Sequence, residues 1–308
     1  MISLVADQTR REHVKLMEKT KKGSGTTDLT VGRPLPQILK FALPLVLGTL
    51  FQQLYSFVDT VIVGRCLGTD ALGAVGTTYS LNFLILGFVL GSCTGFGIPV
   101  AQSFGARDSE DMHKYLFNGA VLCVALSVVF TIVTTLPAAP LLQLIHTPAV
   151  LFPAAVAYIR ILFLGIPATV LFNYTSTVLN SLGDSQHPFY FLLISSFLNI
   201  GLDWLFIVPL GMGVEGAAIA TVVSQLFSGL LCTWWFVPRV EGIHVTRENC
   251  VLSAGHCGRL AYIGLPMGFE YSVSAIGAFI MQDAINLLGS TAVAAQTAGE
   301  KIRQMFTV

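Results

Sequence analysis

Two stretches of the chain resemble each other and decide the fold. Residues 39–74 read LKFALPLVLGTLFQQLYSFVDTVIVGRCLGTDALGA, and residues 260–295 read LAYIGLPMGFEYSVSAIGAFIMQDAINLLGSTAVAA. The pair Leu43-Pro44 aligns with Leu265-Pro266. Each stretch contains an apolar segment long enough to cross a bilayer, which takes about 20 residues. We interpret the two stretches as the first helices of two repeated units.

The same apolar character extends over most of the chain. Of 308 residues, 54% are hydrophobic and only 11% are charged, with a mean hydropathy of +0.73. Soluble domains carry roughly 25% charged residues. Residues 71–106 and 115–159 contain no Asp, Glu, Lys or Arg. The composition excludes a typical soluble enzyme and a disordered chain, and it predicts an all-α polytopic membrane protein.

Seven apolar runs and the start of an eighth follow one another along the chain. They cover about residues 41–63, 72–103, 117–136, 154–179, 188–208, 215–237 and 260–287, and the eighth begins near Ala292. Because the second copy starts after six spans, both copies cross in the same direction. Such a parallel repeat is a transporter architecture. We expect a six-helix N-lobe followed by the start of a C-lobe, with seven to eight of about twelve spans present, and interpret the chain as the N-terminal portion of a longer protein.

The distribution of basic residues predicts the domain limits and the orientation. We expect a polar tail at 1–33, the N-lobe at 34–238, an inter-lobe loop at 239–258 and the start of the C-lobe at 259–308. With the tail in the cytoplasm, thirteen of the 17 Lys and Arg lie in inner segments and only Arg65 lies outside. Basic residues favour the inner side. This predicts a multi-pass protein of the plasma or inner membrane with a cytoplasmic N-terminus.

A metal site is not expected from the sequence. His244, Cys250, His256 and Cys257 share the predicted polar loop. Their spacing matches no standard ligand pattern. We therefore expect no cofactor and no metal other than a coupling Na⁺.

Ionisable residues inside spans are functional candidates because a charge in hydrocarbon is costly. Asp59 lies deep in the first run. Asn199 and Asp203 are four residues apart, which places them on one face of a helix. Together with the Thr221 hydroxyl, their oxygens suit a partly dehydrated Na⁺ or a shared proton. The alternative is that Asn199 and Asp203 only form hydrogen bonds between helices.

Other polar or small residues in the spans have simpler interpretations. We expect Arg160 to reach the membrane surface with its long side chain and Asp283 to be solvated near the outer end of the seventh span. Gly87, Gly91 and Gly95 are spaced four apart and predict close packing against another helix.

Four segments resemble one known family. Residues 57–64 (FVDTVIVG), 199–203 (NIGLD), 213–221 (GVEGAAIAT) and 264–266 (GLP) resemble helices one, five, six and seven of the multidrug and toxic-compound extrusion (MATE) family. The resemblance covers about residues 34–308.

The resemblance implies a secondary antiporter that exports organic cations and drugs by alternating access of two lobes, in exchange for either Na⁺ or H⁺. The family's N-lobe cation site uses the first-helix aspartate, an Asn and an Asp of helix five and a Thr of helix six. Those roles fall on Asp59, Asn199, Asp203 and Thr221. Some members carry a coupling glutamate on helix seven, so Glu270 is a second-lobe candidate, with packing near an interface water as the alternative.

Tyr55 is a candidate for an aromatic cavity that binds flat cations.

A flippase for a lipid-linked oligosaccharide of the same superfamily is the alternative function. The cavity of such a flippase should be richer in basic residues, and the first six spans hold only Arg160. The six histidines lie in the tail, loops or span ends, and no Gly-x-Ser-x-Gly turn is present, so an enzyme is not expected. The repeat also disfavours a seven-helix receptor. We expect a monomer in the lipid bilayer that binds small organic cations and no nucleic acid.

Overall fold

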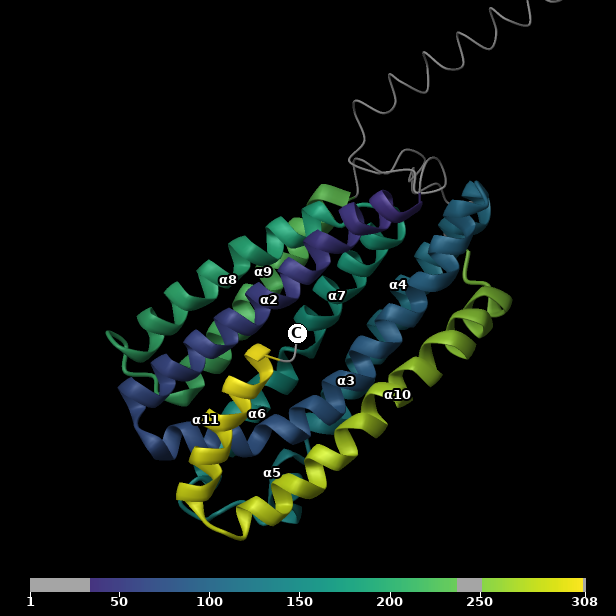
Figure 1. Cartoon of the computed structure of the whole chain (residues 1–308). Helices are drawn as coiled ribbons and strands as arrows, with labels where there is room; N and C mark the ends of the chain where they lie inside the picture. Colours follow the sequence, from purple (N-terminus) through teal and green to yellow (C-terminus); the bar gives the residue numbers. More distant parts are fainter. Residues whose placement is uncertain (1–33, 237–250, 307–308) are drawn as a thin grey trace, which may run out of the picture.

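The computed structural model describes residues 34–236 and 251–306. In these ranges every regular element is an α-helix (Figure 1). The helices are α2 (Pro34–Leu67), α3 (Thr69–Gly105), α4 (Ser109–Thr135), α5 (Ala138–Leu144), α6 (Phe152–Leu164), α7 (Ile166–Ser181), α8 (Gln186–Ile207), α9 (Val214–Phe236), α10 (Ala254–Asn286) and α11 (Ser290–Phe306). The all-α prediction is confirmed. The predicted tail and residues 237–250 of the predicted inter-lobe loop lie outside the described ranges.

Seven of the predicted spans correspond to helices in the structure. Six helices (α2, α3, α4, α8, α9 and α10) are long and apolar enough to cross a membrane, and the pair α6 and α7, bent by 46°, meets the same test when it is counted as one span. The α4 helix shows why these surfaces need lipid. Its exposed valines and isoleucine recur on one face, at Val124, Val128, Val129, Ile132 and Val133. An apolar stripe of this kind is stable against hydrocarbon and costly against water.

The fourth apolar run, predicted at about residues 154–179, consists of two helices and not of one continuous helix. The chain breaks between α6 and α7 at Gly165. Pro167 follows two residues later, and its ring nitrogen carries no hydrogen to donate within a helix. A Cβ at Gly165 would lie 2.2 Å from the Val222 side chain. The glycine therefore lets α9 pack against the bend.

The first helices of the two repeated stretches run in the same direction. In Figure 1, α2 (purple) and α10 (light green to yellow) both run from the upper right to the lower left. The helices that follow them, α3 and α11, run back in the opposite sense. This arrangement is the one expected of a parallel repeat. It places α11 in contact with both α2 and α3.

Close packing joins α3 to α10, as the glycine spacing predicted. A Cβ at Gly91 would lie 2.5 Å from the backbone oxygen of Met267, and one at Gly95 would lie 2.5 Å from the Cα of Gly264. Gly87 is in ordinary van der Waals contact with the same helix. The two backbones therefore approach more closely than any larger residue would permit.

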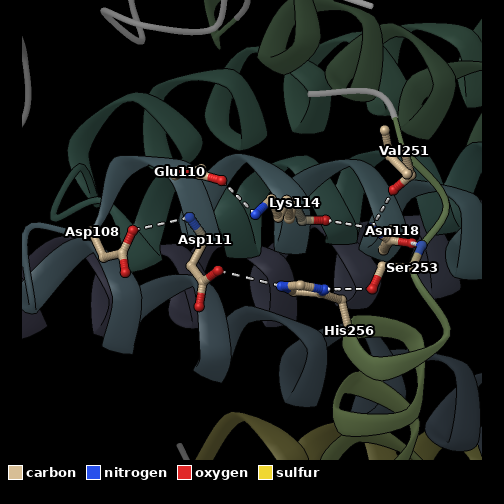
Figure 2. A network of polar contacts seen from close by, with 8 residues as sticks. All are labelled: Asp108, Glu110, Asp111, Lys114, Asn118, Val251, Ser253 and His256. Carbon is tan, nitrogen blue, oxygen red and sulfur yellow. Dashed lines mark hydrogen bonds and ion pairs between the residues drawn. The ribbon is translucent and has the colours of Figure 1, made fainter. Parts of the chain in front are cut away.

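A polar network anchors the start of α10 on α4 (Figure 2). Asn118 is fully buried, and its Nδ2 donates to the Val251 oxygen at 3.2 Å. Its Oδ1 accepts from the Ser253 amide at 3.0 Å. The His256 ring nitrogens lie 2.8 Å from Ser253 Oγ and 3.4 Å from Asp111 Oδ1. Because α10 begins at Ala254, His256 lies in its first turn and not in the predicted loop.

Candidate functional site

Two carboxyl groups from different helices meet inside the bundle. Asp59 belongs to α2 and Asp203 to α8, and the two carboxyl groups lie close enough for their charges to interact. Asp203 is fully buried, and Oδ1 of each carboxyl is buried without a hydrogen-bond partner among the described residues. Two carboxylates this close repel each other unless a proton or a cation lies between them. The pair is therefore a suitable binding place for either.

Asn199 and Thr221 complete the surroundings of Asp203. In the amide orientation that satisfies both of its polar atoms, Asn199 donates to Asp203 Oδ2 at 3.2 Å. Its oxygen accepts from the backbone N–H of Thr221 at 3.3 Å. The spacing of four residues brings Asn199 and Asp203 to one face of α8, and α9 supplies Thr221 opposite them. The structure thus brings together the four residues predicted for the cation site.

Asp59, one member of the acid pair, borders a cavity of about 230 Å³. Asp59 and Thr221 line it, as do three tyrosines from three helices, Tyr55, Tyr79 and Tyr158. Aromatic rings around a carboxylate can hold a flat organic cation by its charge and by its faces. The cavity also receives side chains of α10 and α11, so both repeated stretches contribute to it.

A second, much smaller chamber lies beside the first. Its volume is about 20 Å³, which is the space for one water molecule or a bare cation. Asn199 and Thr221 line it together with Ser224 and Ser228, whose hydroxyl oxygens are buried without a partner among the described residues. Thr221 and Tyr55 line both spaces. Thr221 of the predicted cation site therefore lines both the larger cavity and the smaller chamber.

The remaining predicted residues lie elsewhere. Glu270 is exposed on α10 and lines neither cavity. Arg160 is exposed, in keeping with a side chain that reaches the membrane surface. Asp283 is partly exposed, with its Oδ1 2.9 Å from His146 Nδ1, which agrees with a solvated role. Tyr55 lies beside Asp59, where an aromatic cavity wall was expected.

Lys301 was missed by the sequence reasoning. It lies in the eighth predicted span, and no role was assigned to it. In the structure its Nζ donates to Ser56 Oγ at 2.7 Å and lies 5.2 Å from the centre of the Tyr79 ring. Its charge interacts with that of Asp59. The available signal was a lysine inside a predicted span, which the rule on intramembrane charges singles out.

No cluster suited to a transition metal occurs in the described part of the chain. There, His, Cys, Asp and Glu side chains form no group of three or more that could hold a metal ion. Of the four residues in the predicted loop, His244 and Cys250 lie outside the described ranges. Cys257 donates to Asn118 Oδ1 at 3.1 Å, so it belongs to the network at the start of α10. The oxygen-rich set around Asp203 suits an alkali cation or a proton instead.

These features define a class of protein. Long apolar helices surround a buried acid pair and a polar cavity, which is the construction of a multi-pass membrane transporter. A family model described as MatE matches residues 44–205, which is more than half of the chain. The chain belongs to the MatE family, as the resemblance of its motifs indicated.

Similar proteins agree with this assignment. The probable multidrug resistance protein YpnP of Bacillus subtilis (strain 168) is 29% identical over 286 residues, covering 91% of this chain and 63% of its own length. The FAD transporter of Shewanella oneidensis is 22% identical over 94% of this chain and 64% of its own length. A solved inward-facing multidrug resistance MATE transporter superposes with a TM-score of 0.76 at 28% identity, over 86% of this chain and 61% of that one. The chain thus spans less than two thirds of these proteins.

Proposed function

We propose that the protein containing this chain exports small organic cations, drugs among them, in exchange for Na⁺ or H⁺. The observation that carries the proposal is the pairing of Asp59 with Asp203 beside a cavity of about 230 Å³. The relative YpnP and the solved inward-facing transporter are both described by multidrug resistance. Their names support a xenobiotic substrate for this chain as well.

The chemistry of the pair suggests how exchange would occur. With one proton or Na⁺ held between Asp59 and Asp203, the repulsion between the carboxylates is relieved and the cavity loses negative charge. With the site empty of that cation, the cavity attracts an organic cation. The two ligands therefore compete for one charge, and competition of this kind couples the downhill movement of one to the uphill movement of the other.

The lobes that must move are the repeated units. We propose an N-lobe at 34–238 and the start of a C-lobe at 259–308, joined by the loop at 239–258. The contacts of α10 with α3 and of α11 with α2 and α3 would lie between them. Alternating access would open and close these contacts. We further propose a monomer in the plasma or inner membrane with its N-terminus inside.

The lining of the cavity favours this proposal over an oligosaccharide flippase. An anionic lipid-linked sugar would need a basic cavity. The charged residues that line it are Asp59, Glu300 and Lys301, so acids outnumber bases. Glu270 remains a proposal as a second-lobe coupling residue. It lines neither of the two cavities in the described part of the chain.

Substitution of Asp59 by Asn tests the proposal. Cells that express the gene encoding this chain should retain less ethidium than cells with an empty vector. Asp59→Asn should abolish the difference at unchanged expression, because the amide binds neither a proton nor an organic cation at neutral pH. Asp70→Asn is the matched control, since Asp70 is exposed at the start of α3. Normal efflux by Asp59→Asn would refute the site.

A further inference from the structure

The Lys301 side chain enters the cavity from α11, beside the acid of α2. Its Nζ donates to Ser56 Oγ at 2.7 Å, and Ser56 lies one turn before Asp59 on the same helix. The ammonium also lies 5.2 Å from the centre of the Tyr79 ring, within the range of a cation–π contact. Lys301 is thus held by a hydroxyl and lies over a ring, and it lines the same cavity as Asp59.

Lys301 and Asp59 line the same cavity, and the charge of Asp59 acts on Lys301 more strongly than that of Glu300 on its own helix. Glu300 is hydrogen-bonded to Arg303, with Nε donating to Oε2 at 2.8 Å. Gln304 Nε2 also donates to Glu300 at 3.3 Å. Glu300 is therefore occupied, although its charge still acts on Lys301. Asp59 is therefore the acid whose negative charge Lys301 compensates, although the two residues belong to different repeated units.

The hydrogen bond to Ser56 holds Lys301 near Asp59, and the lysine does not occupy Oδ1 of that carboxyl group. Oδ1 of Asp59 is buried and has no hydrogen-bond partner among the described residues. The carboxylate is thus compensated in charge, but one oxygen stays free to receive a ligand. A cation arriving there meets the positive charge of Lys301 at short range.

We propose that Lys301 is a resident counter-cation of Asp59, which a coupling cation or a cationic substrate must displace. This role rests on the proposed function, under which Lys301 would set how tightly the cavity binds cations and which charge it prefers in a ligand. Displacement would also break the hydrogen bond between α11 and α2. Occupancy of Asp59 would in this way be linked to a contact between the two repeats.

Equilibrium binding of tetraphenylphosphonium to the purified chain tests the proposal. Removing the ammonium in Lys301→Met or Lys301→Gln should tighten binding by about tenfold, because the ligand no longer has to displace the lysine from Asp59. Lys301→Arg, which keeps the charge, should bind like the wild type. Arg259→Gln is the control, since it removes a positive charge from an exposed position on α10 that lines neither cavity. It should also bind like the wild type.

An Asp59→Asn background distinguishes this role from a general charge effect. There, Lys301→Met should change the affinity little, because the acid on which the lysine acts is gone. Unchanged or weaker binding in both Lys301→Met and Lys301→Gln would overturn the proposal, as would absence of binding in all variants. A loss of efflux in Asp59→Asn cells together with either result would leave the proposed function standing.

Discussion

At the scale of single residues, the site depends on a buried acid, Asp203, that accepts a hydrogen bond from the amide of Asn199. Asp203 is fully buried, and Asn199 is 2% exposed. Burying a carboxyl group is costly unless hydrogen bonds or a charge partner compensate it. Asn199 supplies one such bond, and a proton or cation shared with Asp59 would supply the charge compensation. The stability of this region and its cation chemistry therefore involve the same atoms.

Asn199→Ala should destabilise the protein by about 1–3 kcal/mol, since it leaves a buried carboxylate oxygen of Asp203 without its donor. The measurement is thermal unfolding in detergent. Asn173→Ala is a matched control, because Asn173 Nδ2 donates to the Thr169 oxygen of its own helix. Equal melting temperatures for the two variants would contradict this account of Asn199.

The sequence allowed part of this site to be predicted. Spacing alone indicated that Asn199 and Asp203 share a face of one helix. Their proximity to Asp59 depends on how α2 packs against α8, and a local sequence pattern does not determine that packing. The prediction that Asp59 belongs to the same site came from the family resemblance. The position of Lys301 was not predicted, because it depends on the placement of α11 against α2.

At the scale of the elements, composition predicted where helices occur better than where they bend. Seven apolar runs gave seven spans. The break at Gly165 was missed because an apolar run does not show a change of direction. The signal was the sequence Gly165-Ile166-Pro167, which combines a residue that permits close approach with one that lacks an N–H.

The contact between α3 and α10 gives a sharp prediction at this scale. A methyl group added in Gly268→Ala would lie 2.5 Å from Ser92 Oγ and 2.7 Å from the Phe88 oxygen. The variant should be destabilised by about 1–3 kcal/mol, as is usual for overpacking. Gly277→Ala on the same helix meets nothing within 4 Å and should unfold like the wild type. The same loss of stability in both would contradict close packing.

The network at the start of α10 makes a prediction that hydrogen exchange can measure. The Ser253 amide donates to Asn118 Oδ1, so Asn118→Ala should speed exchange at residues 251–257 by about tenfold, the loss of roughly one hydrogen bond. Exchange in α8 should not change and serves as the internal control. Unaltered protection at Ser253 would show that Asn118 does not anchor α10.

At the scale of the whole molecule, the orientation can be tested with native cysteines. Cys66 is exposed near the end of α2, which the basic residues place outside. A membrane-impermeant maleimide should label intact cells, and Cys66→Ser should remove most of that label. Cys257 lies near the start of α10, on the side predicted to be inside, and should react only in everted vesicles. The opposite pattern would invert the topology.

The helices α2 and α10 run parallel, and the two repeated units line one cavity between them. A bundle in which each repeat contributes to one binding space can change access by moving one unit against the other. The acid pair lies on the side of the first unit, and Lys301 reaches it from the second. Cation occupancy at Asp59 is therefore in a position to affect the contact between the units.

The central claim is that a cation bound between Asp59 and Asp203 drives export. The most direct measurement is dye transport in everted vesicles from cells that express the gene, with a Na⁺ or a pH gradient imposed separately. We predict that one of the two gradients drives transport and that Asp59→Asn and Asp203→Asn each abolish it, while Asp70→Asn does not. Gradient-driven transport at the wild-type rate in both acid-pair variants would contradict the claim.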